Sequence, residues 1–185
     1  GEEWMLRLVN ANTPLPEDYV PELASLANGK QFDARAIDAL RQMLSDGNAQ
    51  GLSLMVCSAY RSIARQDELF SAMKQDYMSR GYSEEEATRI TMTIRTPHAC
   101  SEHSSGLAAD IVAQSYQTLD DGFADTPEAR WLFEHAVEYG FILRYPKDKQ
   151  DVTGIIYEPW HYRYVGVENA KKITDSGLCL EEYLA

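Results

Sequence analysis

The chain has 185 residues, and 17 Lys and Arg against 29 Asp and Glu give a formal net charge of −12. This length suits one domain with its own core, so we expect a single domain over residues 1–185. No apolar run approaches the ~18 residues that a membrane span needs. The acidic balance excludes nucleic acid as an expected partner, because phosphate-backbone binding needs clustered Lys and Arg.

Two further features concern processing and redox state. The chain begins with Gly1 rather than Met, which leaves room for a removed N-terminal signal or anchor. Cys57, Cys100 and Cys179 lack the short paired spacing of a zinc ribbon or a disulfide scaffold. One disulfide with a free thiol, or three buried thiols, are the two alternatives.

The first half of the chain predicts two strands and three helices. We expect a strand at 4–9, a loop at 12–21, a helix that starts near Asp33 and closes at Gly47, and a buried strand at 52–57. A helix after Ser62 should bury apolar side chains, namely Leu69, Phe70 and Met73. A further helix starts at Ser83, where Ser-Glu-Glu-Glu is typical of a capping box.

The second half predicts more short strands. One should lie at 107–112, and a helix should start at Thr126-Pro127 and stop at Gly140. Strands are expected at 141–144, 154–157 and 161–165, followed by a helix at 168–175 and a short one after Leu180. Helices and strands mix without βα alternation, which favours an α+β fold with a small, mainly antiparallel sheet flanked by helices.

Two of the four histidines lie in unusual surroundings. His103 lies on a Ser- and Gly-rich loop, and Asp110 lies in the apolar strand that follows it. A carboxylate there is costly to bury without a cation, although backbone amides at a strand end could also satisfy it. Glu158 and His161 flank Pro159, which excludes a regular helix and predicts a kinked, extended segment that aims both side chains into one cleft.

Each segment alone has an ordinary alternative, such as a surface strand with Glu158 paired to Arg163. Together, His103, Asp110 and His161 form a common catalytic zinc set that leaves a fourth position for water. Glu158 can then take the proton of that water without binding the metal. Arg61 follows a buried strand and either clamps an anionic substrate group or pairs with an acidic residue.

The other candidate ligands are weaker. His135 suits a packing or surface role, and His98 suits a solvated loop better than an accessory ligand position. Cys100 as a fourth ligand would close the open position that catalysis needs. The run Glu84-Glu85-Glu86 is most simply a charged helix N-terminus.

The motif Ser101-x-His103-x-x-Gly106-x-Ala108-x-Asp110, followed by Glu158-x-Trp160-His161, resembles the signature of the VanY-type D-alanyl-D-alanine carboxypeptidases. This zinc peptidase group includes VanX and VanXY. Blocks such as 58–62, 140–146 and 162–166 extend the likeness over nearly the whole chain. Ala99-Cys100 stands where the family usually has Pro-Gly, and Ser104-Ser105 where Gln-Thr is common.

The resemblance implies a Hedgehog/D,D-peptidase-like fold, one zinc ion on His103, Asp110 and His161, and Glu158 as general base. It implies that Arg61 stabilises the oxyanion or orients the substrate. The residues implied to contact the substrate are Gln66, Ser101, Tyr145 and Trp160, although Trp160 could equally pack beneath the sheet.

The expected activity is removal of the terminal D-Ala from peptidoglycan stem peptides by a monomer. The alternatives are a D,D-dipeptidase, an L,D-carboxypeptidase, or a zinc-binding wall-recognition module without turnover. A wall substrate implies an extracytoplasmic location, reached through a removed signal or anchor, although the family also has cytoplasmic members.

Overall fold

A four-stranded antiparallel sheet lies at the centre of the computed structural model, which describes residues 3–185. Its strands follow the spatial order β3 (Leu54–Ser58), β4 (Ala108–Ala113), β6 (His161–Tyr164) and β5 (Phe141–Leu143). All six residues of β4 are buried, because this strand is central and covered on both faces. A separate hairpin joins β1 (Leu23–Ser25) to β2 (Gln31–Asp33). The α+β prediction with a mainly antiparallel sheet is confirmed.

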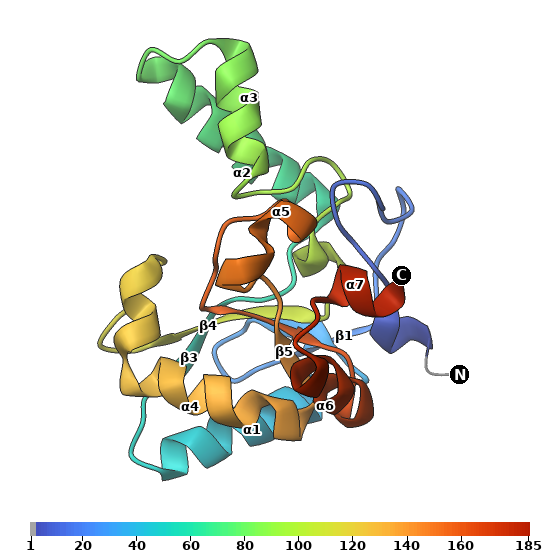
Figure 1. Cartoon of the computed structure of the whole chain (residues 1–185), viewed down its shortest axis with the longest axis vertical. Coiled ribbons are helices and arrows are strands. Elements are labelled where there is room, and N and C mark those ends of the chain that lie inside the picture. Colours follow the sequence, from blue (N-terminus) through green and yellow to red (C-terminus); the bar gives the residue numbers. More distant parts are fainter. Residues whose placement is uncertain (1–2) are drawn as a thin grey trace.

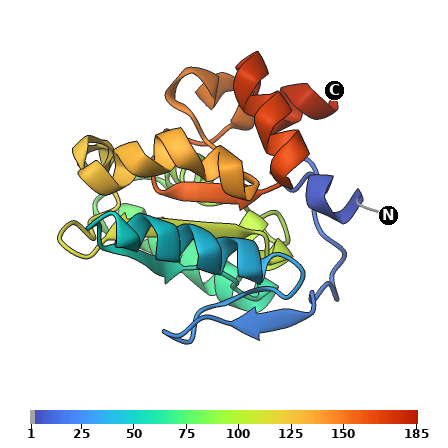
Figure 2. The same cartoon turned by 90° about the horizontal axis from the view of Figure 1, so that it is seen from below.

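Helices α1 (Ile37–Ala49) and α4 (Pro127–His135) lie side by side against one face of the sheet (Figure 2). Their apolar faces share one core with the inner side chains of the strands, including Leu40, Leu132 and Ile111. The chain closes with α5 (Gln150–Thr153), α6 (Val167–Ser176) and α7 (Leu180–Leu184). This packing leaves the other face of the sheet to form a pocket.

A helical hairpin projects from the rest of the molecule (Figure 1). It consists of α2 (Ile63–Ser79) and α3 (Glu84–Met92), and Gln66 is the one buried residue recorded for α2. The prediction that α2 buries Leu69, Phe70 and Met73 is therefore wrong in degree, since all three stay partly exposed. The physical reason is that α2 packs mainly against α3 and not against the sheet.

The predicted helix starts are confirmed by their caps. The hydroxyls of Ser62, Ser83 and Thr126 each accept a hydrogen bond from the backbone N–H three residues further on. The carboxylate of Glu86 accepts hydrogen bonds from Arg89, so the capping box predicted at Ser83 forms only its first half, the bond from the Glu86 N–H to the Ser83 hydroxyl. Gly140 ends the α4 region in the left-handed conformation that glycine favours, as predicted.

Three predictions about elements are wrong. Residues 4–9 form no strand, because the segment starts as a 3₁₀ helix (Glu3–Leu6) and its Trp4 ring stacks on Tyr164. Residues 154–157 form no strand, because Ile156 donates its N–H to the loop carbonyl of Thr93. Helix α1 does not close at Gly47, where an added Cβ would lie 2.3 Å from Leu54 Cδ1. This glycine serves close packing inside the helix, not its termination.

Candidate active site

The register of the sheet brings three site residues into one row. Asp110 on β4 pairs with His161 on β6 and with Ser58 on β3. Directly paired residues on antiparallel strands point to the same face. The strands therefore place the Asp110 carboxylate and the His161 ring together on the face opposite α1 and α4.

His103 reaches the same place from a loop. It lies in the 3₁₀ helix η2 (Glu102–Ser105), which Ser101 caps and which ends at Gly106 with φ +80°. The Nδ1 of His103 lies 2.7 Å from the Ala59 carbonyl oxygen. Because a carbonyl only accepts, Nδ1 donates, and the lone pair of the neutral ring is left on Nε2, facing Asp110.

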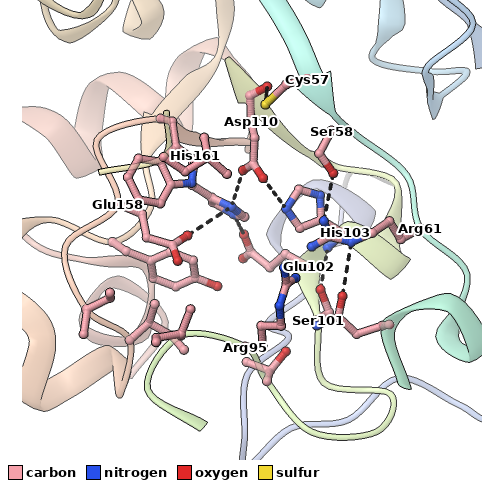
Figure 3. A pocket seen from close by; sticks show the side chains of 18 of the residues that line it. Cys57, Ser58, Arg61, Arg95, Ser101, Glu102, His103, Asp110, Glu158 and His161 are labelled. Carbon is pink, nitrogen blue, oxygen red and sulfur yellow. Dashed lines mark hydrogen bonds and ion pairs between the residues drawn. The ribbon is translucent and has the colours of Figure 1, made fainter. Parts of the chain in front are cut away.

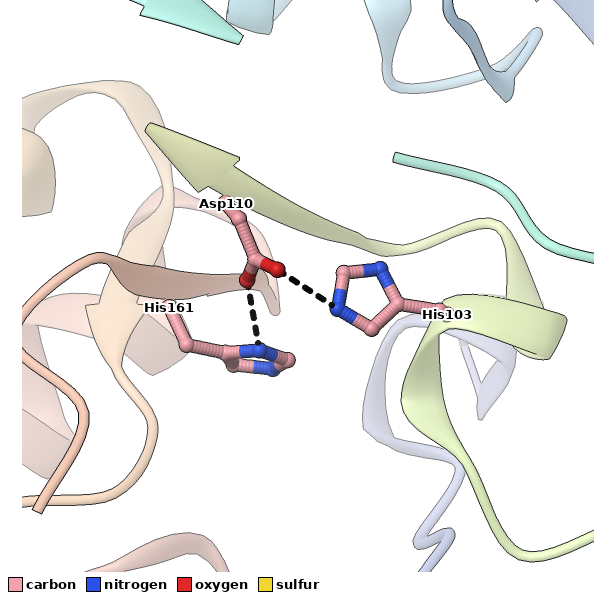
Figure 4. A group of neighbouring side chains, drawn as sticks. All are labelled: His103, Asp110 and His161. Atoms are coloured by element: carbon pink, nitrogen blue, oxygen red, sulfur yellow. Dashed lines mark hydrogen bonds and ion pairs between the residues drawn. The ribbon is translucent and has the colours of Figure 1, made fainter. Parts of the chain in front are cut away.

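The three side chains converge as Figure 4 shows. Asp110 Oδ2 lies 3.2 Å from His103 Nε2, and Asp110 Oδ1 lies 3.0 Å from His161 Nδ1. All three residues are buried, and their ligand atoms lie within 4.8 Å of one another. Two imidazoles and one carboxylate fit the donor set of a catalytic zinc site with one open position. The three predicted ligands therefore converge on one site.

Glu102 contacts the ring nitrogen of His161 that does not face Asp110. Its Oε1 accepts from His161 Nε2 at 3.2 Å, and its Oε2 accepts from Arg144 at 2.6 Å and from Arg163 at 2.8 Å. Burial raises the pKa of Glu102, but the two arginines outweigh it and hold that pKa far below its usual value. Arg144 also binds both carboxylate oxygens of Glu181 on α7. The ring of His161 is therefore fixed by a charged network whose central members, Glu102, Arg144 and Arg163, are fully buried.

Glu158 lies in the loop before β6, where His161 donates its N–H to the Glu158 carbonyl across the turn at Pro159 and Trp160. The kink expected at Pro159 is confirmed. Glu158 Oε1 lies 3.7 Å from His161 Nδ1 and stands outside the three-ligand cluster. Burial raises the pKa of the Glu158 carboxyl to about 8, although His161 favours its charged form. A carboxyl of this kind exchanges protons near neutral pH.

Arg61 and its neighbours form one side of the pocket. Its Nε donates to Gln66 at 3.1 Å and its Nη1 donates to Ser58 Oγ at 2.9 Å. Its backbone N–H binds the His103 carbonyl, which couples the segment after β3 to η2. Among residues 3–185 Arg61 forms no ion pair with an acidic side chain, so the alternative role expected for it is not found there. Ser101 lines the pocket as well as capping η2.

Tyr145 and Trp160 also line the pocket. The Tyr145 ring lies 4.7 Å from the His161 ring, centroid to centroid, and supports it. Trp160 is buried in the main core and also lines the pocket, so both roles expected of it are found.

The pocket has a volume of about 550 Å³ and opens onto the three-ligand cluster (Figure 3). All nine residues predicted for the site, namely Arg61, Gln66, Ser101, His103, Asp110, Tyr145, Glu158, Trp160 and His161, line it. The three cysteines are free thiols, and Cys100 binds a backbone carbonyl in the N-terminal loop. His98 binds acidic side chains at the surface, as its expected solvated position implies. His135, expected in a packing or surface role, both pairs with Glu138 and packs against the Trp131 ring.

Sequence reasoning missed three contributors, namely Glu102, Arg163 and Arg95. Glu102 was given no role, and Arg163 was considered only as a partner of Glu158, whereas Arg163 is fully buried against Glu102. Arg163 sits two residues after His161 on the same strand face, and this period-two placement is the signal that could have found it. No comparable signal marks Arg95, which also lines the pocket.

An α+β domain with three convergent ligands, a nearby free carboxyl and an open pocket has the organisation of a mononuclear metallohydrolase. A family model described as VanY, D-alanyl-D-alanine carboxypeptidase, matches residues 29–167. The chain belongs to this family, as its motifs suggested.

Relatives agree with this assignment. A D-alanyl-D-alanine carboxypeptidase of Enterococcus faecalis is 42% identical over 185 residues, covering 99% of this chain, and the chain spans 66% of that relative's length. Solved VanYB in complex with D-alanine-D-alanine is 40% identical, with a TM-score of 0.88 over 98% of this chain and 97% of that one. A variant of the VanY D,D-pentapeptidase from a VanB-type vancomycin-resistance cassette, solved with Zn(II), has the same identity and TM-score over 98% and 99% of the two chains.

Proposed function

We propose that this chain is a zinc-dependent D,D-carboxypeptidase that hydrolyses the terminal D-Ala from peptidoglycan stem peptides. The observation that carries the proposal is the convergence of His103, Asp110 and His161 at the base of a pocket that also holds Glu158. Membership of the VanY family and the D-alanine-D-alanine complex of VanYB support the substrate class.

In the proposed reaction, a bound zinc ion would supply Lewis acidity toward the scissile carbonyl and the attacking water. Glu158 takes a proton from that water at its carboxylate and gives it to the leaving amine. Arg61, held by Gln66 and Ser58, faces the negative charge that develops on the attacked carbonyl oxygen. Gln66, Ser101 and Tyr145 contact the C-terminal end of the peptide, and Trp160 forms a wall of the cleft.

Product analysis by mass spectrometry tests this proposal. Pentapeptide, tetrapeptide and free D-Ala-D-Ala are incubated separately with the zinc-loaded protein, with and without a chelator. We expect loss of one D-Ala from the pentapeptide, abolished by the chelator and restored by zinc. Preferred cleavage of the free dipeptide or of the tetrapeptide would establish a D,D-dipeptidase or an L,D-carboxypeptidase instead. Stoichiometric zinc without hydrolysis of any of the three would establish a recognition module.

We further propose that the protein acts on the wall side of the cytoplasmic membrane, because mature stem peptides lie there. No helix among residues 3–185 is long and apolar enough to cross a membrane. Fractionation of cells that express the natural gene, followed by immunodetection, should find the protein outside the cytoplasm. Recovery in the cytosolic fraction alone would contradict this location.

A further inference from the structure

Arg95 is a second guanidinium in the pocket that the proposed reaction leaves without a role. It follows α3 at the base of the helical hairpin and lines the same cavity as Arg61 and Glu158. Figure 3 shows its side chain extending into the pocket from the side across from Asp110. It therefore stands where a bound peptide would pass.

The guanidinium of Arg95 has unused hydrogen-bonding capacity. Its Nε is buried and has no hydrogen-bond partner in the described part of the chain. Within residues 3–185, no carboxylate forms an ion pair with it, whereas the buried Arg144 and Arg163 both bind Glu102. A partly buried donor without a partner costs free energy, and a ligand that supplies an acceptor would recover it.

The two pocket arginines differ in this respect. Arg61 is held by the side chains of Gln66 and Ser58. Burial lowers the pKa of Arg95, while the charges of Asp110 and Glu158 act on it without direct contact and partly oppose that shift. A planar guanidinium with free donors matches the two oxygens of a carboxylate. In a chain of net charge −12, such a local cation also favours entry of an anionic ligand.

We propose that Arg95 binds a carboxylate of the peptide substrate and so sets a preference for acidic peptides, an inference that rests on the proposed function. A stem peptide can offer this group in two places: its terminal carboxylate, or a free carboxylate on an internal residue. Both present the same chemistry to the guanidinium, and the experiment separates them.

Binding is measured by calorimetry on zinc-loaded protein in a Glu158→Gln background, so that peptides are not consumed. Three peptides of one sequence are compared: the diacid, the internal carboxamide and the C-terminal carboxamide. We expect Arg95→Met to lower the affinity for the diacid about ten- to a hundredfold, which corresponds to the loss of a hydrogen bond to a charged group. The affinity of Arg95→Lys for the diacid should lie between those of the parent and Arg95→Met, because lysine keeps the charge and loses the planar guanidinium.

The carboxamide that no longer responds to Arg95→Met identifies the carboxylate that Arg95 binds. The matched control is Arg89→Met on α3, whose side chain is 64% exposed and paired with Glu86, and it should leave all three affinities unchanged. A change of less than about threefold in the affinity for the diacid, or an equal loss of affinity for all three peptides, would overturn the inference.

Turnover of the same peptides by the protein with Glu158 intact tests the proposed function separately. Arg95-dependent binding without hydrolysis would refute the carboxypeptidase and leave the carboxylate site standing. Hydrolysis together with affinities that do not depend on Arg95 would support the carboxypeptidase and refute the carboxylate site. Melting temperatures of the Met and Lys variants within a few degrees of the parent establish that the fold is intact.

Discussion

Glu102 connects a metal-ligand candidate to the interior of the protein through one carboxylate. One of its oxygens orients His161, and the other is shared by Arg144 and Arg163, both with fully buried side chains. Partners that fix the outer nitrogen of a ligating imidazole tune metal affinity as well as orientation. A change at this residue should therefore act on both stability and zinc binding.

Replacing Glu102 with Ala leaves two buried arginines without their shared anion. We expect a loss of about 3–5 kcal/mol in the free energy of unfolding, the cost of breaking a buried ion pair. Zinc affinity should fall about 10- to 100-fold. Urea unfolding of the metal-free protein and zinc competition with a chromophoric chelator measure the two effects.

Glu102→Gln separates orientation from charge. Its side-chain carbonyl can still accept from His161, so zinc affinity should recover relative to Glu102→Ala, while much of the stability loss stays because both arginines lose their counter-charge. Equal zinc affinities for the two variants would show that Glu102 does not position the imidazole.

Glu158→Gln tests the proposed general base. The residue lies outside the three-ligand cluster, so the variant should bind zinc as the parent does. General acid–base groups contribute about 10²–10⁴-fold, and we expect kcat on a D-Ala-terminated pentapeptide to fall by that much with little change in KM. Steady-state kinetics, with the zinc content of each sample measured, tests this expectation. An unchanged kcat would show that Glu158 is not the general base.

At the scale of elements, the turn that ends η2 is tightly constrained. Gly106 has φ +80°, and an added Cβ would lie 2.9 Å from Pro21 Cγ. Gly106→Ala should destabilise the protein by about 2–4 kcal/mol, combining the left-handed penalty with overpacking. Gly154→Ala is the matched control, since φ is +77° there and nothing lies within 4 Å of the added atom.

We expect Gly154→Ala to cost only the backbone penalty of about 1–2 kcal/mol. Thermal unfolding of both variants measures the difference. If both lose the same amount, the approach of Pro21 to the turn carries no energetic weight.

The sequence predicted the central elements well because local signals and burial agree there. Strands β3, β4 and β6 and the starts of α2, α3 and α4 carry apolar runs or side-chain caps that need no tertiary context. The ligand residues were found because their motif is local, and the sheet register then brings Asp110 and His161 together.

The remaining errors come from contacts between distant segments. Residues 4–9 have a strand-like apolar composition, but Trp4 packs on Tyr164 and the guanidinium of Arg35, and no strand pairs with the segment. Gly47 resembles a helix stop, yet its lack of a side chain serves contact with Leu54 and Trp131. The Glu102 network joins η2, Arg144 directly after β5, Arg163 on β6 and Glu181 on α7, and no local pattern reveals these contacts.

At the scale of the whole molecule, zinc binding and folding stability should be linked. The ligands come from η2, β4 and β6, so an ion that joins them binds the folded state more tightly than the unfolded chain. The melting temperature should therefore rise with free zinc and fall on addition of a chelator. Differential scanning calorimetry over a zinc series checks this.

Asp110→Ala serves as the comparison for that series. It removes one of the three ligands, and its melting temperature should respond little to zinc. A parent protein whose melting temperature is independent of zinc would contradict a site built from these three residues.

The contact between Arg144 and Glu181 has a consequence for biosynthesis. Two of the candidate ligands, His103 and Asp110, are translated well before the third, and the anchor of the third extends to the closing helix α7. A growing polypeptide cannot assemble this centre until His161, the third candidate ligand, has left the ribosome. Metal capture is thereby deferred to a late stage of synthesis, and a product that ends before α7 would lack the Glu181 carboxylate that holds Arg144 beside Glu102.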